Sequence, residues 1–201
     1  MVVLTIYSAN QVFVSLEIDG GLLMEPIIVE LFTGEKKVKS LEVIMPAVEK
    51  LLEKAKLTVK DITHIAVSSG VGSFTSLRVG LITAKTLALM TGAKLISFTT
   101  FDLLEEKNSL SKKEYLAALA YAGGYYVKNK KGEVRLYKQD EISEIRDKTL
   151  FEEQLFIIKA TWDVVAGKIA KKEFVSPIEL DAYYVENSRA EDELEAKNKK
   201  K

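Results

Sequence analysis

The segment Ser69–Arg78, SGVGSFTSLR, carries more information about the architecture than any other part of the chain. It follows an apolar run, Ile62–Ser68, that is typical of a buried strand, and it leads into a long helical pattern from about Thr75 to Met90. Glycines between a buried strand and a helix start allow backbone N–H groups to face an anion, helped by the helix dipole. The segment has no Walker A lysine and no third glycine of G-x-G-x-x-G. A plain strand-to-helix turn, capped by Ser73 or Thr75, therefore remains the simplest alternative.

The residues on both sides of this segment predict alternating strands and helices. The expected elements are three strands, a helix, a strand, a helix and a strand, in the order Val2–Ser8, Val12–Ile18, a strand within Leu22–Phe32, Ser40–Lys56, Ile62–Ser68, Thr75–Met90 and Ala93–Phe98. Pro46 should kink the first helix or confine its regular part to the residues after the proline. Gly92 lies where a glycine commonly ends a helix. The order predicts an α/β fold in which helical crossovers connect the later strands.

The second half of the chain is less regular. It predicts a short helix at Phe101–Lys107, strands at Tyr115–Tyr121, Tyr125–Lys128, Glu133–Lys138 and Asp181–Glu186, and a helix at Asp163–Lys171, with a mixed pattern at Phe151–Ala160. We expect an N-terminal lobe over residues 1–98 and a reduced second lobe over 99–189. Residues 190–201 offer almost nothing to bury and should form a frayed helix or be disordered.

The composition excludes several classes of function. The 201 residues carry 29 Lys plus Arg and 29 Asp plus Glu, so the net charge is zero, which disfavours a chain that binds nucleic acid by itself through a basic surface. There is no cysteine and only one histidine, His64, so thiolate chemistry and multi-histidine metal sites are excluded. No apolar run is long enough to span a membrane and no signal peptide is evident, so we expect a cytoplasmic protein. Tyr121, Tyr125 and Tyr126 fit half-buried strand positions better than a base-stacking surface.

The helix expected at Thr75–Met90 is apolar or small nearly all round, so both of its sides must be covered. We expect one side to face a partner subunit in a helix bundle with the Ser40–Lys56 helix, across a smooth strip with acidic and basic residues beside it. The residues assigned to this interface are Glu42, Met45, Glu49, Leu77, Arg78, Leu81, Ala84, Lys85 and Ala88. The alternative is that the two helices cover each other within the monomer.

Residues 70–78, GVGSFTSLR, resemble the signature G-P-G-S-F-T-G-L-R of the bacterial TsaB (YeaZ) family. The helix after this signature continues the resemblance through residue 104, and residues 40–46, SLEVIMP, resemble the family's H-S-E-x-L-L-P segment. Residues 57–68 resemble its next linker and strand, and residues 181–184 resemble its terminal segment weakly. The resemblance covers roughly residues 1–105.

This resemblance implies a two-lobed α/β fold of the actin/Hsp70/sugar-kinase (ASKHA) type, with a reduced second lobe. It implies a non-catalytic subunit that supports the TsaD-type catalytic subunit, alongside the TsaE-type ATPase, in making N6-threonylcarbamoyladenosine at position 37 of tRNA. The implied partners are therefore TsaD, TsaE, a second copy of the chain, and tRNA through the complex only, with no membrane. No metal or tightly bound cofactor is implied, and ATP or ADP would belong to the interface of the complex.

Several departures from the family pattern remove polar chemistry. Tyr7-Ser8 replaces the Asp-Thr pair that ends the first strand, Ser40 replaces a histidine, and Ala120–Gly124 replaces a D-A-R-R-G segment. We therefore expect a reduced phosphate loop at Gly70, Gly72, Ser73 and Thr75 that binds nucleotide weakly or not at all. Two alternatives stay open, an active ATPase or phosphotransferase of the same fold and a homodimeric interaction module that has drifted from tRNA modification.

Overall fold

The computed structural model describes most of the chain, namely residues 1–9, 11–19, 21–22, 27–30, 32–33, 36–37, 39–111, 113–120, 124–150 and 154–185. The tail expected to be frayed or disordered, residues 190–201, lies outside the described residues. So do residues 121–123 in the segment that departs from the family pattern.

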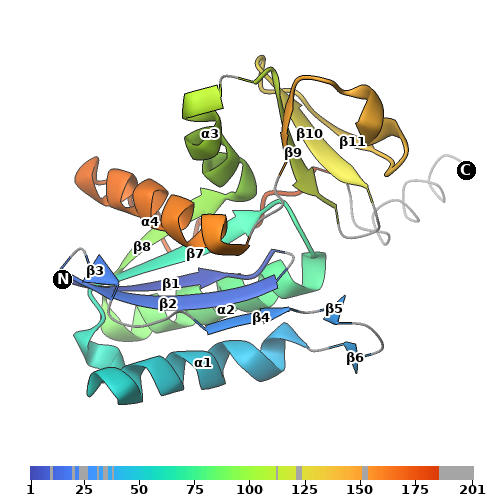
Figure 1. The fold of residues 1–201 in the computed structure, drawn as a ribbon. Coiled ribbons are helices and arrows are strands. Elements are labelled where there is room, and N and C mark those ends of the chain that lie inside the picture. The colour runs from blue at the N-terminus through green and yellow to red at the C-terminus, as the bar shows by residue number, and fades with distance from the viewer. Residues whose placement is uncertain are drawn as a thin grey trace, which may run out of the picture.

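The first sheet forms the centre of the larger lobe (Figure 1). Its strands are β1 Val2–Tyr7, β2 Gln11–Ile18, β3 Gly21–Leu22, β4 Ile27–Glu30, β7 His64–Gly70 and β8 Lys94–Thr99. They lie in the order β3-β2-β1-β7-β8, and β4 also pairs with β2. The β1–β2 pair is antiparallel, whereas β1, β7 and β8 are parallel because helices connect them. Two short strands, β5 Phe32–Thr33 and β6 Lys36–Lys37, pair with each other.

Helices cover both faces of this sheet. Helices α1 Ser40–Ala55 and α2 Phe74–Thr91 lie on one face, and α4 Gln154–Ala170 lies on the other with α3 Thr100–Ser111 beside it (Figure 1). The short helix η1 Val59–Asp61 connects α1 to β7. Alternate strand residues divide between the two layers, so that Leu4 and Ile6 pack toward α1 and α2 while Val3 and Tyr7 pack toward α4. Helix α4, which comes after the second sheet in the chain, therefore packs on the first sheet.

The smaller sheet has the order β11-β10-β9-β12. Its elements are β9 Tyr115–Leu119, β10 Tyr125–Asn129, β11 Val134–Tyr137, η2 Glu141–Glu144 and β12 Lys148–Leu150. Tyr126 faces an apolar cluster with Phe101 of α3, whereas Val127 faces the opposite side, where Ile142 packs. One face of the sheet is thus covered by α3 and the other only in part by the turn around η2.

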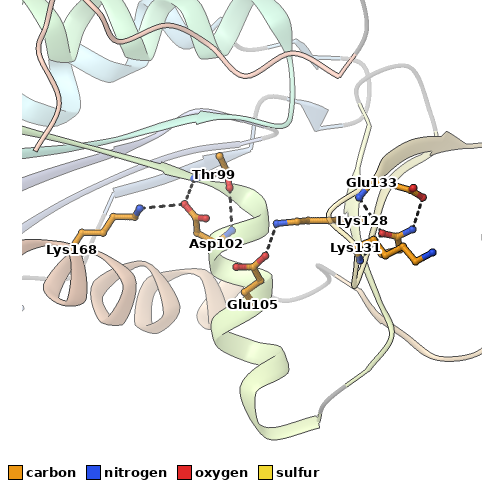
Figure 2. A network of polar contacts seen from close by, with 8 residues as sticks. Thr99, Asp102, Glu105, Lys128, Lys131, Glu133 and Lys168 are labelled. Atoms are coloured by element: carbon orange, nitrogen blue, oxygen red, sulfur yellow. Dashed lines mark hydrogen bonds and ion pairs between the residues drawn. The ribbon is translucent and has the colours of Figure 1, made fainter. Parts of the chain in front are cut away.

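Helix α3 connects the two lobes through ion pairs on its opposite sides (Figure 2). Asp102 accepts a hydrogen bond from the Thr99 backbone N–H at 2.8 Å and lies 3.8 Å from Lys168 of α4. Glu105, one turn further along, pairs with Lys128 of β10 at 2.5 Å. The Thr99 hydroxyl accepts from the Asp102 N–H in return, so the two residues form a reciprocal cap at the start of the helix.

Three expectations about the elements are corrected. Pro46 does not confine the regular part of α1 to the residues after it, because the helix runs from Ser40 to Ala55 with the exposed Pro46 inside it, where water can satisfy the carbonyl that loses its partner. Helices α3 and α4 are longer than expected, and α4 begins at Gln154. Residues 181–185 do not form a strand; instead they pack along α2. No helix in the described part of the chain has both the length and the apolar composition to cross a membrane.

Candidate functional site

The loop between β7 and α2 is packed tightly against the end of β1. The Ser73 backbone N–H donates to the Ala9 carbonyl oxygen at 2.7 Å, so it is not available to an anion. A Cβ placed on Gly72 would lie 2.5 Å from the Ala9 Cβ, so glycine is needed for this close approach. Thr75 is exposed in the first turn of α2, and the Ser73 side chain, although buried, makes no capping hydrogen bond.

Residues 176–185, here named the C-terminal strap, occupy the space beside the glycine at the end of β7. The Tyr183 N–H donates to the Ser69 carbonyl oxygen at 2.6 Å. Gly70 has a φ of +147°, and a Cβ on it would lie 2.4 Å from the Tyr183 carbonyl oxygen. The space that a phosphate loop keeps open for its ligand is therefore filled here by the chain's own backbone.

The strap also binds the two basic side chains of α2. Arg78 lies over the Phe74 ring at 3.8 Å and donates from Nε to the Tyr184 hydroxyl at 3.0 Å, and the Phe74 and Tyr184 rings are 4.8 Å apart. Lys85 Nζ donates to the Leu180 carbonyl oxygen at 2.7 Å. Arg78 and Lys85, which were assigned to the partner interface, therefore also make contacts within the chain that the sequence did not predict.

Tyr7, which replaces the aspartate of the family pattern, is completely buried. Thr100 donates its hydroxyl proton to the Val71 carbonyl oxygen at 3.0 Å, so the Tyr7 hydroxyl is the donor in its 3.3 Å contact with Thr100. Burial raises the pKa of the Tyr7 phenol well above its usual range, so it stays neutral. The phenol thus helps to hold the loop and supplies no negative charge for a cation.

These surroundings do not fit a magnesium-bound nucleotide. The carboxylate that would hold the metal is absent at Tyr7, and the glycine cradle is occupied by Ala9 and Tyr183. Within the described ranges, His, Asp and Glu side chains form no group of three that could hold a metal ion.

The apolar strip assigned to the partner interface is buried inside the monomer. Leu77, Leu81, Ala84 and Ala88 all pack in the two clusters around the first sheet. The expectation that these four residues face a partner is therefore wrong. The periodicity of α2 identified two apolar sides correctly, but it could not tell which of them faces the sheet.

The opposite side of the helix layer exposes large apolar side chains. Four of them have exposed fractions between 64% and 72%: Leu41 of α1 and Ile82, Leu89 and Met90 of α2. Glu42 and Glu49 of α1 are also exposed, and Met45 is half-buried. We name the surface formed by Leu41, Ile82, Leu89 and Met90 the outer apolar face. Ile82 and Leu89, seven residues apart, share one side of α2, and exposed apolar side chains grouped on a helix are typical of a protein–protein contact.

One buried ionisable group was missed by the sequence analysis. Glu17 of β2 is only 3% exposed and accepts hydrogen bonds from the hydroxyls of Ser15 and, at 3.4 Å, Thr5. Burial raises the pKa of Glu17 to about 7. The sequence predicted the strand Val12–Ile18 but not that both of its faces are buried, with α4 packing on the side of Phe13. Only the β1–β2 register, which places Thr5 beside Ser15, shows how the carboxyl group is satisfied.

Replacing Gly70 with alanine should destabilise the protein by at least about 2 kcal/mol. The new Cβ would clash with the Tyr183 carbonyl oxygen, and the alanine would be held at a φ that is unfavourable for a residue with a side chain. The matched control is Gly92→Ala, which also has a positive φ, +73°, but no atom within 4 Å. That variant should lose only about 1 kcal/mol. Urea denaturation measures both. Equal losses would show that the strap does not pack against Gly70.

Comparisons with known proteins agree with the signature around the loop. A profile of the family described as "TsaD: tRNA N6-adenosine threonylcarbamoyltransferase" matches residues 36–155, more than half of the chain. The tRNA threonylcarbamoyladenosine biosynthesis protein TsaB of Buchnera aphidicola subsp. Acyrthosiphon pisum is 24% identical over 167 residues, which cover 79% of this chain and 76% of that protein. The tRNA N6-adenosine threonylcarbamoyltransferase of Shouchella clausii is 46% identical over 55 residues, 27% of this chain and 16% of that protein.

Among solved structures, YeaZ from Pseudomonas aeruginosa has the same fold, with a TM-score of 0.66 at 15% identity over 92% of this chain and 99% of that one. This likeness, the two sheets and the strand order confirm the two-lobed α/β fold of the actin/Hsp70/sugar-kinase type. The signature at residues 70–78, the family profile and the TsaB relatives agree with one another. The chain thus belongs to the family described as tRNA N6-adenosine threonylcarbamoyltransferase, and within it to the TsaB/YeaZ proteins.

Proposed function

We propose that this protein is a non-catalytic subunit that binds and supports a TsaD-type catalytic subunit in the threonylcarbamoylation of tRNA adenosine 37. The names of the TsaB relatives place those proteins in threonylcarbamoyladenosine biosynthesis, and that pathway is the one proposed for this chain. A TsaE-type ATPase completes the complex, tRNA is bound through the complex, and the chain pairs with a second copy when alone. ATP or ADP binds only where the partner completes a site.

The outer apolar face is the observation that carries the partner role. Four large apolar side chains exposed on adjacent helices cost solvation free energy in the monomer, and burial against another helix layer removes that cost. The neighbouring Glu42 and Glu49 are exposed and free of the strap, so they can meet basic groups of the partner and select its orientation.

The closed loop supports the absence of catalysis. Phosphoryl transfer depends on metal ions and basic groups that stabilise charge on the phosphates. In this chain Tyr7 offers a neutral phenol, the Ser73 N–H is used by Ala9, and Arg78 is held against Phe74 and Tyr184. Each group that could have served a phosphate stabilises the fold instead.

Purification of a tagged full-length chain from its source cell tests the proposal, together with ATP turnover by the pure protein. We expect a TsaD-type subunit to co-purify and the isolated chain to show no magnesium-dependent ATP hydrolysis. Appreciable hydrolysis would favour the alternative of an active ATPase or phosphotransferase. Recovery of the chain only as a homodimer, without a TsaD-type subunit, would favour a drifted interaction module and would overturn the proposal.

A further inference from the structure

Two hollows flank the β10–β11 hairpin turn, far along the chain from the outer apolar face. The first, here named the tyrosine hollow, has a volume of about 160 Å³ and lies on the face of the second sheet away from α3. It is lined by Tyr115, Val127, Asn129, Glu133, Arg135 and Tyr137. The second, named the lysine hollow, has a volume of about 380 Å³ and shares Asn129 with the first. The turn between them is the tip of the smaller lobe's hairpin (Figure 2).

Strand register builds the tyrosine hollow. Val127 pairs with Arg135 on β11 and with Ala117 on β9, so the buried Val127 forms an apolar floor beside an exposed guanidinium. Tyr115 pairs with Asn129 at one end of this row, and Tyr137 pairs with Tyr125 at the other. The hollow thus has aromatic rings at its two ends and a cation at its side.

The polar groups of the tyrosine hollow differ in how they are engaged. Asn129 Oδ1 accepts from the Lys131 and Glu133 N–H groups at 2.9 and 3.0 Å, and Asn129 Nδ2 donates to the Glu133 carboxylate at 2.9 Å. The turn is therefore held in a fixed conformation. The Arg135 guanidinium, in contrast, makes no hydrogen bond or ion pair with another residue in the described part of the chain. A free guanidinium beside an apolar floor is available to an anionic or planar ligand.

The lysine hollow gathers four lysines and two glutamates on the other side of the turn. Lys113, Lys128, Lys130 and Lys131 line it together with two carboxylates, Glu105 and Glu114. The pairs Lys130–Glu114, at 3.6 Å, and Lys113–Asp147, at 3.1 Å, are solvent-exposed, so exchanging these carboxylates for phosphates costs little. Lys131 pairs with no carboxylate among the described residues. Lys113, Lys128 and Lys130 are thus each paired with a carboxylate, and Lys131 is the lysine of this hollow that is left for a phosphate among the described residues.

We propose that the hairpin tip binds single-stranded RNA, with one base on the tyrosine hollow and the neighbouring phosphates at the lysine hollow and Arg135. A base is planar and stacks on tyrosine or arginine without regard to its sequence, while lysines neutralise the backbone. The inference rests on the proposed function, since a tRNA-modifying complex supplies the RNA. It adds a direct contact made by this subunit, beyond the partner interface.

Fluorescence anisotropy with a short fluorescein-labelled single-stranded RNA at low salt tests this on the full-length chain. Tyr137→Leu keeps apolar bulk but removes the ring, and it should weaken binding about tenfold, whereas Tyr137→Phe should bind like the wild type. Arg135→Ala should weaken binding by a similar factor. Arg146→Ala is the matched control, because Arg146 is exposed but does not line either hollow, and it should change nothing.

The salt dependence of binding tests the lysine hollow separately. Lys131→Ala should lower the slope of log affinity against log salt by about 0.7, the value for one phosphate contact with a single strand. Circular dichroism checks that each variant is folded. Equal binding by all variants, no RNA binding by the wild type at low salt, or AMP binding as tightly as the RNA would each overturn the proposal. Co-purification of the TsaD-type subunit with Arg135→Ala should be unchanged, which distinguishes failure here from failure of the proposed function.

Discussion

Ile82→Glu should weaken association with a TsaD-type subunit at least a hundredfold while leaving the monomer folded. Ile82 is an exposed residue of the outer apolar face on α2, so a carboxylate is tolerated there in the free chain. In the complex the same carboxylate would be buried without a partner, which costs about 3 kcal/mol or more. Leu89→Glu, two turns further along the same face, should act in the same direction. Titration of the partner by surface plasmon resonance measures both effects.

Two control variants make this result interpretable. Leu136→Glu places the same charge on an exposed apolar residue of the second lobe, and it should leave the affinity unchanged. Leu81→Glu lies one residue from Ile82 but is buried among the core residues, and it should abolish folding, as circular dichroism would show. Undiminished binding by both Ile82→Glu and Leu89→Glu would show that the outer apolar face is not the interface.

Self-association should respond to the same variants if the two partners share one surface. Light scattering on the isolated wild-type chain is expected to give a dimer, and Ile82→Glu should give a monomer because an isologous contact buries the new carboxylate on both sides. A variant that stays dimeric but loses the TsaD-type subunit would place the homodimer on another surface.

The contrast between Leu81 and Ile82 shows where sequence reasoning stops. Helical periodicity established that α2 has two apolar sides, and the signature at residues 70–78 established the strand–loop–helix unit that the structure confirms. The side that faces the sheet depends on packing with distant strands and helices, and the strap, which contacts Lys85 and Arg78, also comes from far along the chain. Residues separated by about a hundred positions decide that arrangement, and no local pattern encodes it.

Local sequence patterns were also unable to predict which groups occupy the loop between β7 and α2. Gly70 and Gly72 predicted a close backbone approach, and the structure has one at each glycine, but the approaching groups are Tyr183 and Ala9 of the chain itself. The glycines indicate that another group approaches the backbone closely, but they do not indicate which group it is. Tyr7 could be identified as a departure from the family pattern, whereas its contact with Thr100 required the fold.

Glu17→Gln should change the pH dependence of stability by about 3 kcal/mol. Burial holds the pKa of Glu17 at about 7 in the folded protein against 4.5 in the unfolded chain. Below about pH 4.5 both states are protonated and the carboxyl group costs nothing. As the pH rises toward 7 the unfolded chain releases the proton while the folded protein keeps it, so stability falls, and above pH 7 the cost is complete. Urea denaturation between pH 4 and pH 9 should therefore show the variant becoming more stable relative to the wild type.

The size of that change depends on the burial of Glu17 and not on the loss of a charge in general. Glu49→Gln removes a carboxylate of the same chemistry from an exposed position on α1, so it is the matched control for the loss of a surface charge. Every other titrating group contributes equally to the wild type and to Glu17→Gln, so subtracting the two stability curves isolates the carboxyl group between Thr5 and Ser15. A difference that is flat from pH 4 to pH 9 would mean that Glu17 titrates at its ordinary pKa and is reached by water beneath α4.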